Sequence, residues 1–94
     1  MAQTQTAGIL VERPDAALLA RLGVASWPIW TKEISTFDWS YDQIERCYFL
    51  EGRVVVKTAQ GEVRIGQGDF VTFPKGLACT WQVQAPVRKH YRFG

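Results

Sequence analysis

The sequence predicts an all-β, antiparallel barrel or sandwich with one short helix near the N-terminus. Beyond residue 26 the chain divides into short segments rich in valine, isoleucine and aromatic residues, each bounded by glycine, proline, aspartate or serine. These segments recur about every eight to twelve residues without a second helical pattern, which is typical of antiparallel all-β folds. Hydrophobic residues make up 47% of the 94 residues, which is enough for the core of one domain without disulfides.

The first eight residues are small and polar, so they offer nothing to bury. We therefore expect residues 1–8 to form a frayed, disordered tail and residues 9–94 to form a single domain. The apolar segment 9–11 is a candidate edge strand.

Residues 14–23 carry the one strong helical pattern. Pro14 suits the first turn of a helix, and the alanines and leucines that follow propagate it. Gly23 is a natural stop signal. The helix should pack against the rest of the domain through an apolar face formed by Leu18, Leu19 and Leu22.

From residue 27 onward the pattern is that of β-strands. The predicted strands are 27–34, 35–39, 45–50, 53–58, 62–65, 70–73, 79–83 and 87–93. Residues 59–61 predict a tight hairpin turn, because Gly61 can adopt a positive φ. Residues 66–69 and 74–76 close the next two connections.

Two glycine-anchored motifs lie in this β region. In the first, six residues separate Glu45 from Gly52. In the second, five residues separate Gly68 from the Pro-x-Gly turn at 74–76. This spacing resembles the two motifs of the cupin superfamily, in which histidines accompany the glutamate. The aligned histidine positions carry Trp39, Tyr41 and Cys79.

The resemblance extends over roughly residues 29–83. The segments 27–30, 73–76 and 79–81 (Trp-Pro-Ile-Trp, Phe-Pro-Lys-Gly and Cys-Thr-Trp) are similar to those of small single-domain cupins. These are grouped with the cupin domains of ureidoglycine aminohydrolase and of ethanolamine-utilisation proteins, in a branch for which no activity is implied. The resemblance implies a cupin barrel, a double-stranded β-helix or jelly roll, whose motif glutamate points inward.

Strand alternation places Glu45, Cys47 and Phe49 on one face. If the glutamate points inward, as the resemblance implies, Cys47 does too and Cys79 lies nearby. The predicted pocket is a small-molecule site with Glu45 and Cys79 as candidate catalytic groups, an acid or base and a thiol. Its candidate substrate-binding residues are Trp39, Tyr41, Cys47, Trp81 and Lys89. The alternatives are that the cysteines only pack in the core and that Glu45 forms a salt bridge with an inward-facing cation.

The last predicted strand decides which basic side chain reaches this pocket. Val87, Lys89, Tyr91 and Phe93 share one face, and Arg88, His90 and Arg92 share the other. The apolar members favour the first face as the inner one, which carries Lys89 toward the pocket. A register shift of one residue would reverse the assignment and turn His90 inward.

The sequence lacks most of the metal ligands of histidine-rich cupins. An indole offers no usable lone pair, and a phenol must first lose a proton whose reference pKa is about 10. Glu45 and Cys79 are two ligands, fewer than the three protein ligands typical of catalytic zinc. We therefore predict no metal and no cofactor. The alternative is a divalent metal at Glu45 and Cys79, supplemented by Tyr41, Cys47 or His90.

Composition limits the other partners. The net charge of +2 comes mainly from residues 88–92, too narrow a basic surface for nucleic acid. No apolar run reaches membrane-spanning length. Two cysteines do not make a disulfide framework, so we expect a cytoplasmic protein with free thiols. Sheet edges and exposed apolar aromatics that need cover predict a homodimer.

The leading functional hypothesis is a small-molecule-binding cupin, either a binding protein or a metal-independent enzyme acting on a small nitrogenous or carbonyl metabolite. The second hypothesis is a metal-dependent cupin with the atypical Glu45 and Cys79 shell. The third is a non-catalytic dimeric module whose pocket is filled by side chains. Pocket volume separates the first hypothesis from the third.

Overall fold

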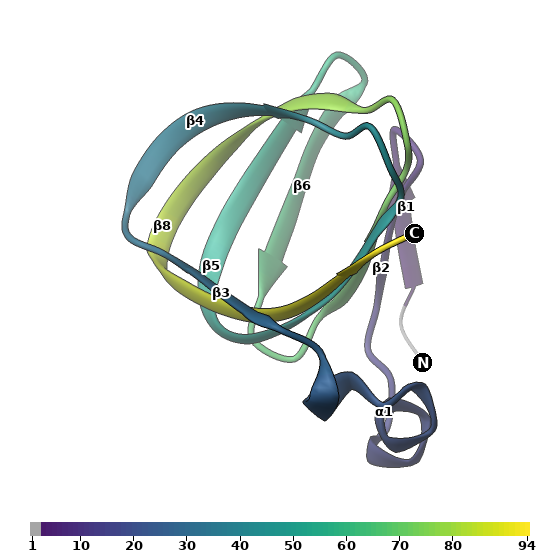
Figure 1. Ribbon diagram of the computed structural model, residues 1–94. Helices are drawn as coiled ribbons and strands as arrows, with labels where there is room; N and C mark the ends of the chain where they lie inside the picture. The colour runs from purple at the N-terminus through teal and green to yellow at the C-terminus, as the bar shows by residue number, and fades with distance from the viewer. Residues whose placement is uncertain (1–2) are drawn as a thin grey trace.

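The computed structural model describes residues 3–94 and confirms an antiparallel β fold with one short α-helix over that range (Figure 1). The helical elements are α1 (Ala16–Leu22) and a single 3₁₀ turn, η1 (Val24–Ser26). The strands are β1 (Gln3–Thr6), β2 (Ile9–Glu12), β3 (Ile29–Lys32), β4 (Ser35–Ser40), β5 (Glu45–Thr58), β6 (Gly61–Gly66), β7 (Phe70–Phe73) and β8 (Ala78–Phe93). Within the same range no helix combines the length and the apolar character that a membrane span requires.

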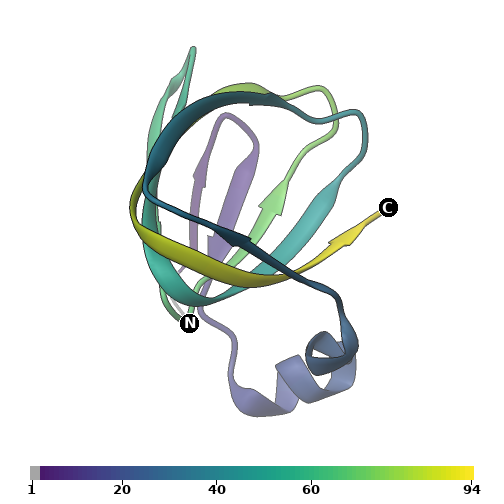
Figure 2. The same cartoon turned by 60° about the vertical axis from the view of Figure 1, so that its left-hand side comes forward.

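The strands form one sheet that curls into a barrel (Figure 1). Its order is β1-β2-β7-β5-β8-β3, with β4 paired to β8 and β6 paired to β5. In Figure 2, β3 and β8 cross in front of the β1–β2 hairpin and β7, which form the opposite wall. The two long strands, β5 and β8, therefore hold the barrel together, because every strand except β1 and β2 pairs with at least one of them.

β5 and β8 are each one bent strand, where the sequence predicted two. The β5–β8 register shifts between Phe49 and Val54, which marks a bulge in the paired strands. Gly52 lies in this bulge with φ of 113°, and a Cβ atom there would come within 2.8 Å of the Pro86 carbonyl oxygen. The missing side chain lets the two strands stay paired through the bend, so Gly52 bends β5 instead of ending it.

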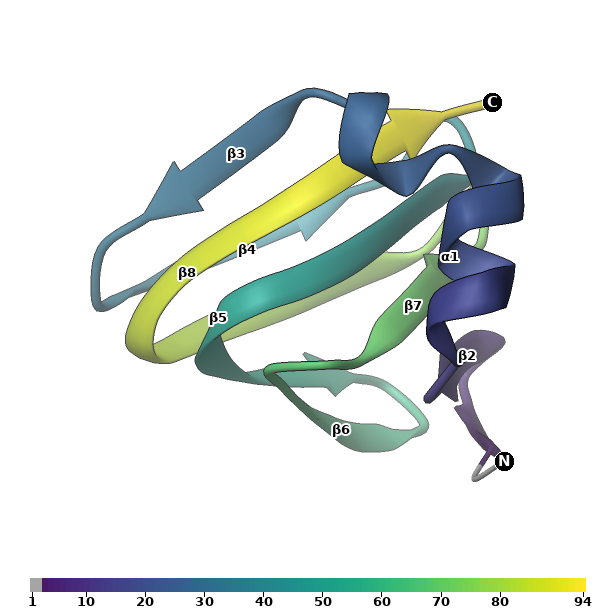
Figure 3. The same ribbon diagram turned by 90° about the horizontal axis from the view of Figure 1, so that it is seen from below.

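The helix ends at Gly23 as predicted, but it begins at Ala16, after Pro14, and it contributes less to the core than expected. The Asp15 side chain accepts a hydrogen bond from the Leu18 backbone N–H at 2.9 Å, and Gly23 ends the helix in the left-handed conformation with φ of 70°. Leu18 and Leu19 are half-buried, whereas Leu22 is 39% exposed. Figure 1 and Figure 3 show α1 outside the barrel, on the segment of chain that links β2 to β3. None of its residues is buried, so the helix does not reach the interior.

The N-terminal segment differs from the expected tail. Residues 3–6 form β1, which pairs with β2 through a tight turn at Ala7 and Gly8, where both φ angles are positive. β2 then pairs with β7, and Ile9 is completely buried. The hairpin forms because it supplies hydrogen bonds to the sheet edge and an apolar side chain to the core. Residues 1 and 2 lie outside the described residues.

Aromatic rings dominate the inside of the barrel. Phe49 and Phe73 lie with their ring centroids 6.2 and 5.7 Å from that of Trp81. Tyr41 stacks on Phe73 at 5.0 Å. This arrangement places the polar side chains described next against a wall of aromatic rings.

Candidate functional site

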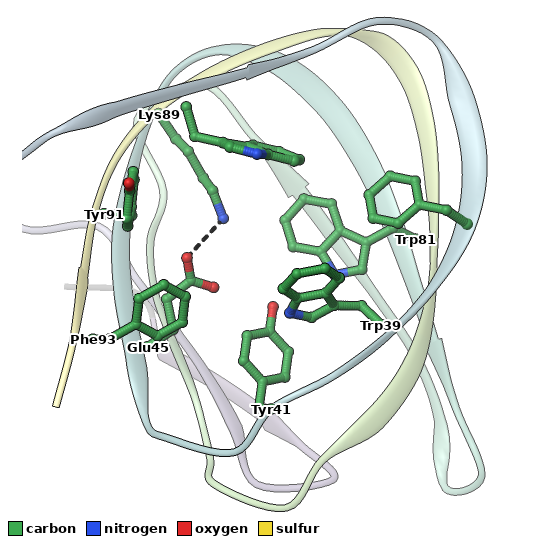
Figure 4. Close-up of a pocket in the computed structure, with 9 residues that line it drawn as sticks. Trp39, Tyr41, Glu45, Trp81, Lys89, Tyr91 and Phe93 are labelled. Atoms are coloured by element: carbon green, nitrogen blue, oxygen red, sulfur yellow. Dashed lines mark hydrogen bonds and ion pairs between the residues drawn. The ribbon is translucent and has the colours of Figure 1, made fainter.

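A cavity of about 190 Å³ opens inside the barrel (Figure 4). Its walls come from β3, β4, β5, β8 and the residue that follows β4. The lining residues are Trp30, Phe37, Trp39, Tyr41, Glu45, Trp81, Lys89, Tyr91 and Phe93. All except Glu45 and Lys89 are aromatic. The cavity is smaller than the roughly 300–1,000 Å³ of pockets for drug-sized ligands, so it suits a compact molecule.

The two charged residues of the cavity form an ion pair. Lys89 Nζ donates a hydrogen bond to Glu45 Oε2 at 3.0 Å, and both side chains are 5% exposed. The residues lie 44 positions apart and come from β5 and β8. Figure 4 shows both side chains pointing into the cavity. The structure therefore contains the salt bridge between Glu45 and an inward-facing cation that the sequence offered as an alternative.

The register of β8 fixes which basic side chain enters the barrel. Lys89 lies opposite Phe49 of β5 and opposite Trp30 of β3. His90 faces the other side, where its Nδ1 lies 2.9 Å from the Trp27 carbonyl oxygen. Strand alternation therefore gave the side-chain direction found in the structure, with Lys89 inward and His90 outward.

Aromatic faces surround the Lys89 ammonium. Its Nζ lies 4.6 Å from the ring centroid of Trp81 and 4.9 Å from that of Trp30. The rings of Phe49 and Phe73 are 5.7 and 5.9 Å away. Cation–π contacts of this kind contribute about 0.5–2 kcal/mol each, more when water is excluded. They offset part of the cost of removing the ammonium from water, and Glu45 supplies the counter-charge.

Tyr41 places a neutral hydroxyl beside this pair. The side chain is buried, and in Figure 4 its oxygen points into the cavity on the same side as Glu45. Burial raises the pKa of Tyr41 well above its usual value, and the nearby Glu45 carboxylate raises the pKa further. The phenol therefore stays protonated and can donate a hydrogen bond to a ligand.

Neither cysteine lines the cavity or bonds to the ion pair. Cys47 is fully buried in the core, where its Sγ donates to the Val71 carbonyl at 3.6 Å, and it does not line the cavity. Burial raises the pKa of Cys47 to about 12, which makes the thiol inert near neutral pH. Cys79 donates to the Trp39 carbonyl at 3.6 Å and lines a separate open depression with Lys57. Burial also raises the pKa of Cys79.

Of the predicted site residues, the structure thus gathers five around one cavity: Trp39, Tyr41, Glu45, Trp81 and Lys89. The predicted pairing of Glu45 with Cys79 is not found there, because Glu45 bonds to Lys89. Trp39 stands at the rim, 49% exposed.

Sequence reasoning missed four lining residues: Trp30, Phe37, Tyr91 and Phe93. Tyr91 and Phe93 could have been found, since they share a strand face with Lys89. Phe37 could also have been found, because it shares a face of the predicted strand 35–39 with Trp39. Trp30 carried no such signal. Both residues reach the cavity because β3 and β4 pair with β8, which sets Trp30 opposite Lys89 and Phe37 opposite Trp81.

These residues do not fit the divalent metal that the cupin resemblance implies. Across residues 3–94 no three histidine, cysteine, aspartate or glutamate side chains gather as a ligand set. The Glu45 carboxylate already bonds to an ammonium, which would repel a divalent cation at the same oxygen. The Lys89 ammonium therefore occupies Glu45, the one motif ligand that the chain retains.

Comparison with known proteins identifies the family of the chain. The family model of the EutQ-like cupin domain matches residues 19–91. A crystal structure of a DUF861 family protein from Thermotoga maritima is 53% identical, with a TM-score of 0.89 over 92% of this chain and 99% of that one. None of the functionally curated proteins compared with the chain matches it.

More distant structures share the fold. The Clostridium difficile EutQ protein is 21% identical, with a TM-score of 0.65 over 97% of this chain and 74% of that one. A putative ethanolamine utilization protein Q from Salmonella typhimurium LT2 is 18% identical, with a TM-score of 0.64 over 92% of this chain and 68% of that one. Together with the family model, which spans the barrel from α1 to β8, these findings confirm the cupin resemblance: the chain belongs to the EutQ-like cupin family.

Proposed function

We propose that this protein binds a small molecule in the aromatic cavity, with the polar part of the ligand at Glu45 and Lys89. The observation that carries the proposal is the buried ion pair at an open cavity. A buried ion pair is weak evidence for stability, since apolar side chains of similar size often stabilise a core as well or better. Charged groups held inside a concave apolar site are instead typical of binding and catalytic sites.

The cavity favours this proposal over a module whose pocket is filled by side chains. Space of about 190 Å³ remains among the lining residues, although large rings surround it. The ligand would place an apolar part against these rings and an acceptor or donor atom at the pair. The proposal includes a cytoplasmic location, because both cysteines are free and free thiols are typical of reducing compartments.

Tryptophan fluorescence provides the test. Trp30, Trp39 and Trp81 line the cavity, whereas Trp27 contacts Phe70 outside it. A set of small neutral and charged metabolites should contain compounds that quench the emission and raise the melting temperature. Binding should weaken in Glu45→Gln and stay unchanged in Glu62→Gln, an exposed glutamate that serves as the matched control.

Two results would contradict the proposal. In the first, no compound in the set changes either the fluorescence or the melting temperature. In the second, a compound binds equally well to wild type and Glu45→Gln, which would place its site elsewhere. Glu45→Gln must remain folded by circular dichroism for this comparison to count.

A further inference from the structure

The Lys89 ammonium has hydrogen-bonding capacity to spare. An ammonium carries three N–H donors, and among the residues that the structure describes its one hydrogen bond goes to Glu45. The aromatic faces around it attract the positive charge but offer no acceptor oxygen. Because Lys89 also lines the cavity, an acceptor atom of a ligand can approach its remaining donors.

The charge balance of the cavity favours an uncharged ligand. Glu45 and Lys89 neutralise one another, and the other seven lining residues are aromatic. A fully charged ligand would lose its hydration without gaining a free counter-ion. A neutral molecule with one carbonyl oxygen and a small apolar body matches both the spare donors and the aromatic walls.

The same geometry supplies what an amine needs to react with a carbonyl carbon. The nucleophile is the neutral amine, so the ammonium must first give up a proton, and the Glu45 carboxylate stands 3.0 Å away to accept it. Buried lysines in apolar sites are the ones that proteins use for Schiff bases. The Tyr41 hydroxyl stays protonated and can bond to the carbonyl oxygen during the attack.

We propose that Lys89 forms an imine with a small neutral aldehyde or ketone in the cavity, with Glu45 as the proton carrier and Tyr41 as the hydrogen-bond donor to the carbonyl oxygen. The inference rests on the proposed function and deepens it. It adds imine formation at Lys89 to the binding function and names small neutral aldehydes and ketones as the class of substrate.

The steps balance in protons and electrons. Lys89 passes a proton to Glu45, and the amine lone pair forms a C–N bond while the carbonyl π electrons move to oxygen. Glu45 returns the proton to that oxygen and then removes one from the nitrogen, which gives a neutral carbinolamine. Glu45 finally protonates the hydroxyl group, which leaves as water as the nitrogen lone pair forms the C=N bond. The products are a protonated imine paired with the Glu45 carboxylate and one water molecule.

Reductive trapping tests the step in the intact protein. The chain is incubated with propanal, butanone or cyclopentanone and sodium cyanoborohydride, which adds hydride to the imine and fixes it as a secondary amine. Peptide mapping by mass spectrometry then compares Lys89 with the other lysines of the same molecule, Lys32, Lys57 and Lys75. We expect Lys89 to be modified first although it is the most buried of the four. In denaturant this preference should disappear.

Variants separate a reactive lysine from a structural one. Lys89→Arg keeps a cation for Glu45 and cannot form an imine, so the fast adduct should be lost while the fold remains. Glu45→Gln should slow labelling of Lys89 by about 10²-fold or more, the range for a positioned acid–base group, and Tyr41→Phe should slow it less. Glu62→Gln should leave the rate unchanged.

The proposal is overturned if Lys75 or Lys57 reacts as fast as Lys89 in the folded wild type, or if Glu45→Gln labels Lys89 at the wild-type rate. Both readouts use proteins that contain Lys89, so a folding defect of Lys89→Arg does not affect them. If carbonyl compounds quench the tryptophan fluorescence but no adduct is trapped at Lys89, the imine step fails and the binding function stands. If they neither quench nor react, both proposals fail for this substrate class.

Discussion

Replacing Lys89 with methionine leaves the Glu45 carboxylate buried without the ammonium that it faces at 3.0 Å. Methionine keeps a similar length and apolar stem, so the change removes mainly the charge. Both partners are 5% exposed, so water does little to screen the carboxylate that remains. Breaking a buried pair in this way costs about 3–5 kcal/mol.

The midpoint of thermal unfolding should fall accordingly. For a domain of this size 1 kcal/mol corresponds to about 4–8 °C, so the lower bound of about 3 kcal/mol predicts a shift of about 12–24 °C. Glu45→Gln should also destabilise the fold, but less, because the four rings around Lys89 still stabilise its charge.

The double variant Glu45→Gln/Lys89→Met provides the decisive comparison. It contains neither charge, so we expect it to be more stable than Lys89→Met alone. We expect its loss of stability to be smaller than the sum of the two single losses by a coupling of about 3 kcal/mol, in the range seen for contacting residues. Urea unfolding followed by circular dichroism at pH 7 measures all four proteins, with Lys75→Met as the exposed lysine control.

Additive effects would refute this reasoning. If each single variant lost less than about 1 kcal/mol and the double variant lost their sum, the pair would behave like an exposed salt bridge. The cavity would then be open to water at its inner end, and the Lys89 ammonium would be hydrated like that of a surface lysine.

Four other predictions concern the bend, the thiol, the metal and assembly. Gly52→Ala should destabilise the fold by more than about 1–3 kcal/mol in urea unfolding, because its φ is 113° and the new Cβ would approach the Val87 Cα at 2.8 Å; an unchanged midpoint would show that the bulge can relax. Cys47 should make stability fall between pH 9 and pH 12, because its pKa is about 12 in the fold against 9.0 unfolded and the unfolded thiol ionises first; Cys47→Ala should flatten this part of a pH-dependent unfolding curve. Elemental analysis should find no stoichiometric Zn, Mn, Fe or Ni, and EDTA should leave ligand binding unchanged; one equivalent that disappears in Glu45→Gln would contradict the misfit argued for the site. Light scattering at tens of micromolar should give a homodimer, since Ile34 and Trp39 expose 64% and 49% of their surface, and a monomer mass would rule it out.

Local properties of the sequence determined the elements of this fold. An apolar segment between turn signals gave β7 with the bounds that the structure has, and alternation placed Lys89 on the inner face of its strand. The inward direction of Glu45 was an expectation from the cupin resemblance, and the structure has it. The glycine at position 23 likewise predicted the end of the helix. These features follow from backbone conformation and a two-residue period, which act within a few positions of the chain.

The tertiary structure decided which inner faces meet. Alternation and the cupin resemblance together predict that Glu45, Cys79 and Lys89 point inward, but they do not give the position of each side chain along the barrel. That position depends on the β5–β8 register and on the bulge at Gly52, both set by hydrogen bonds between strands far apart in sequence. They bring Lys89, and not Cys79, to the Glu45 carboxylate. Pairing of β3 and β4 with β8 then closes Trp30 and Phe37 over the same cavity, because strand neighbours are chosen by the whole sheet.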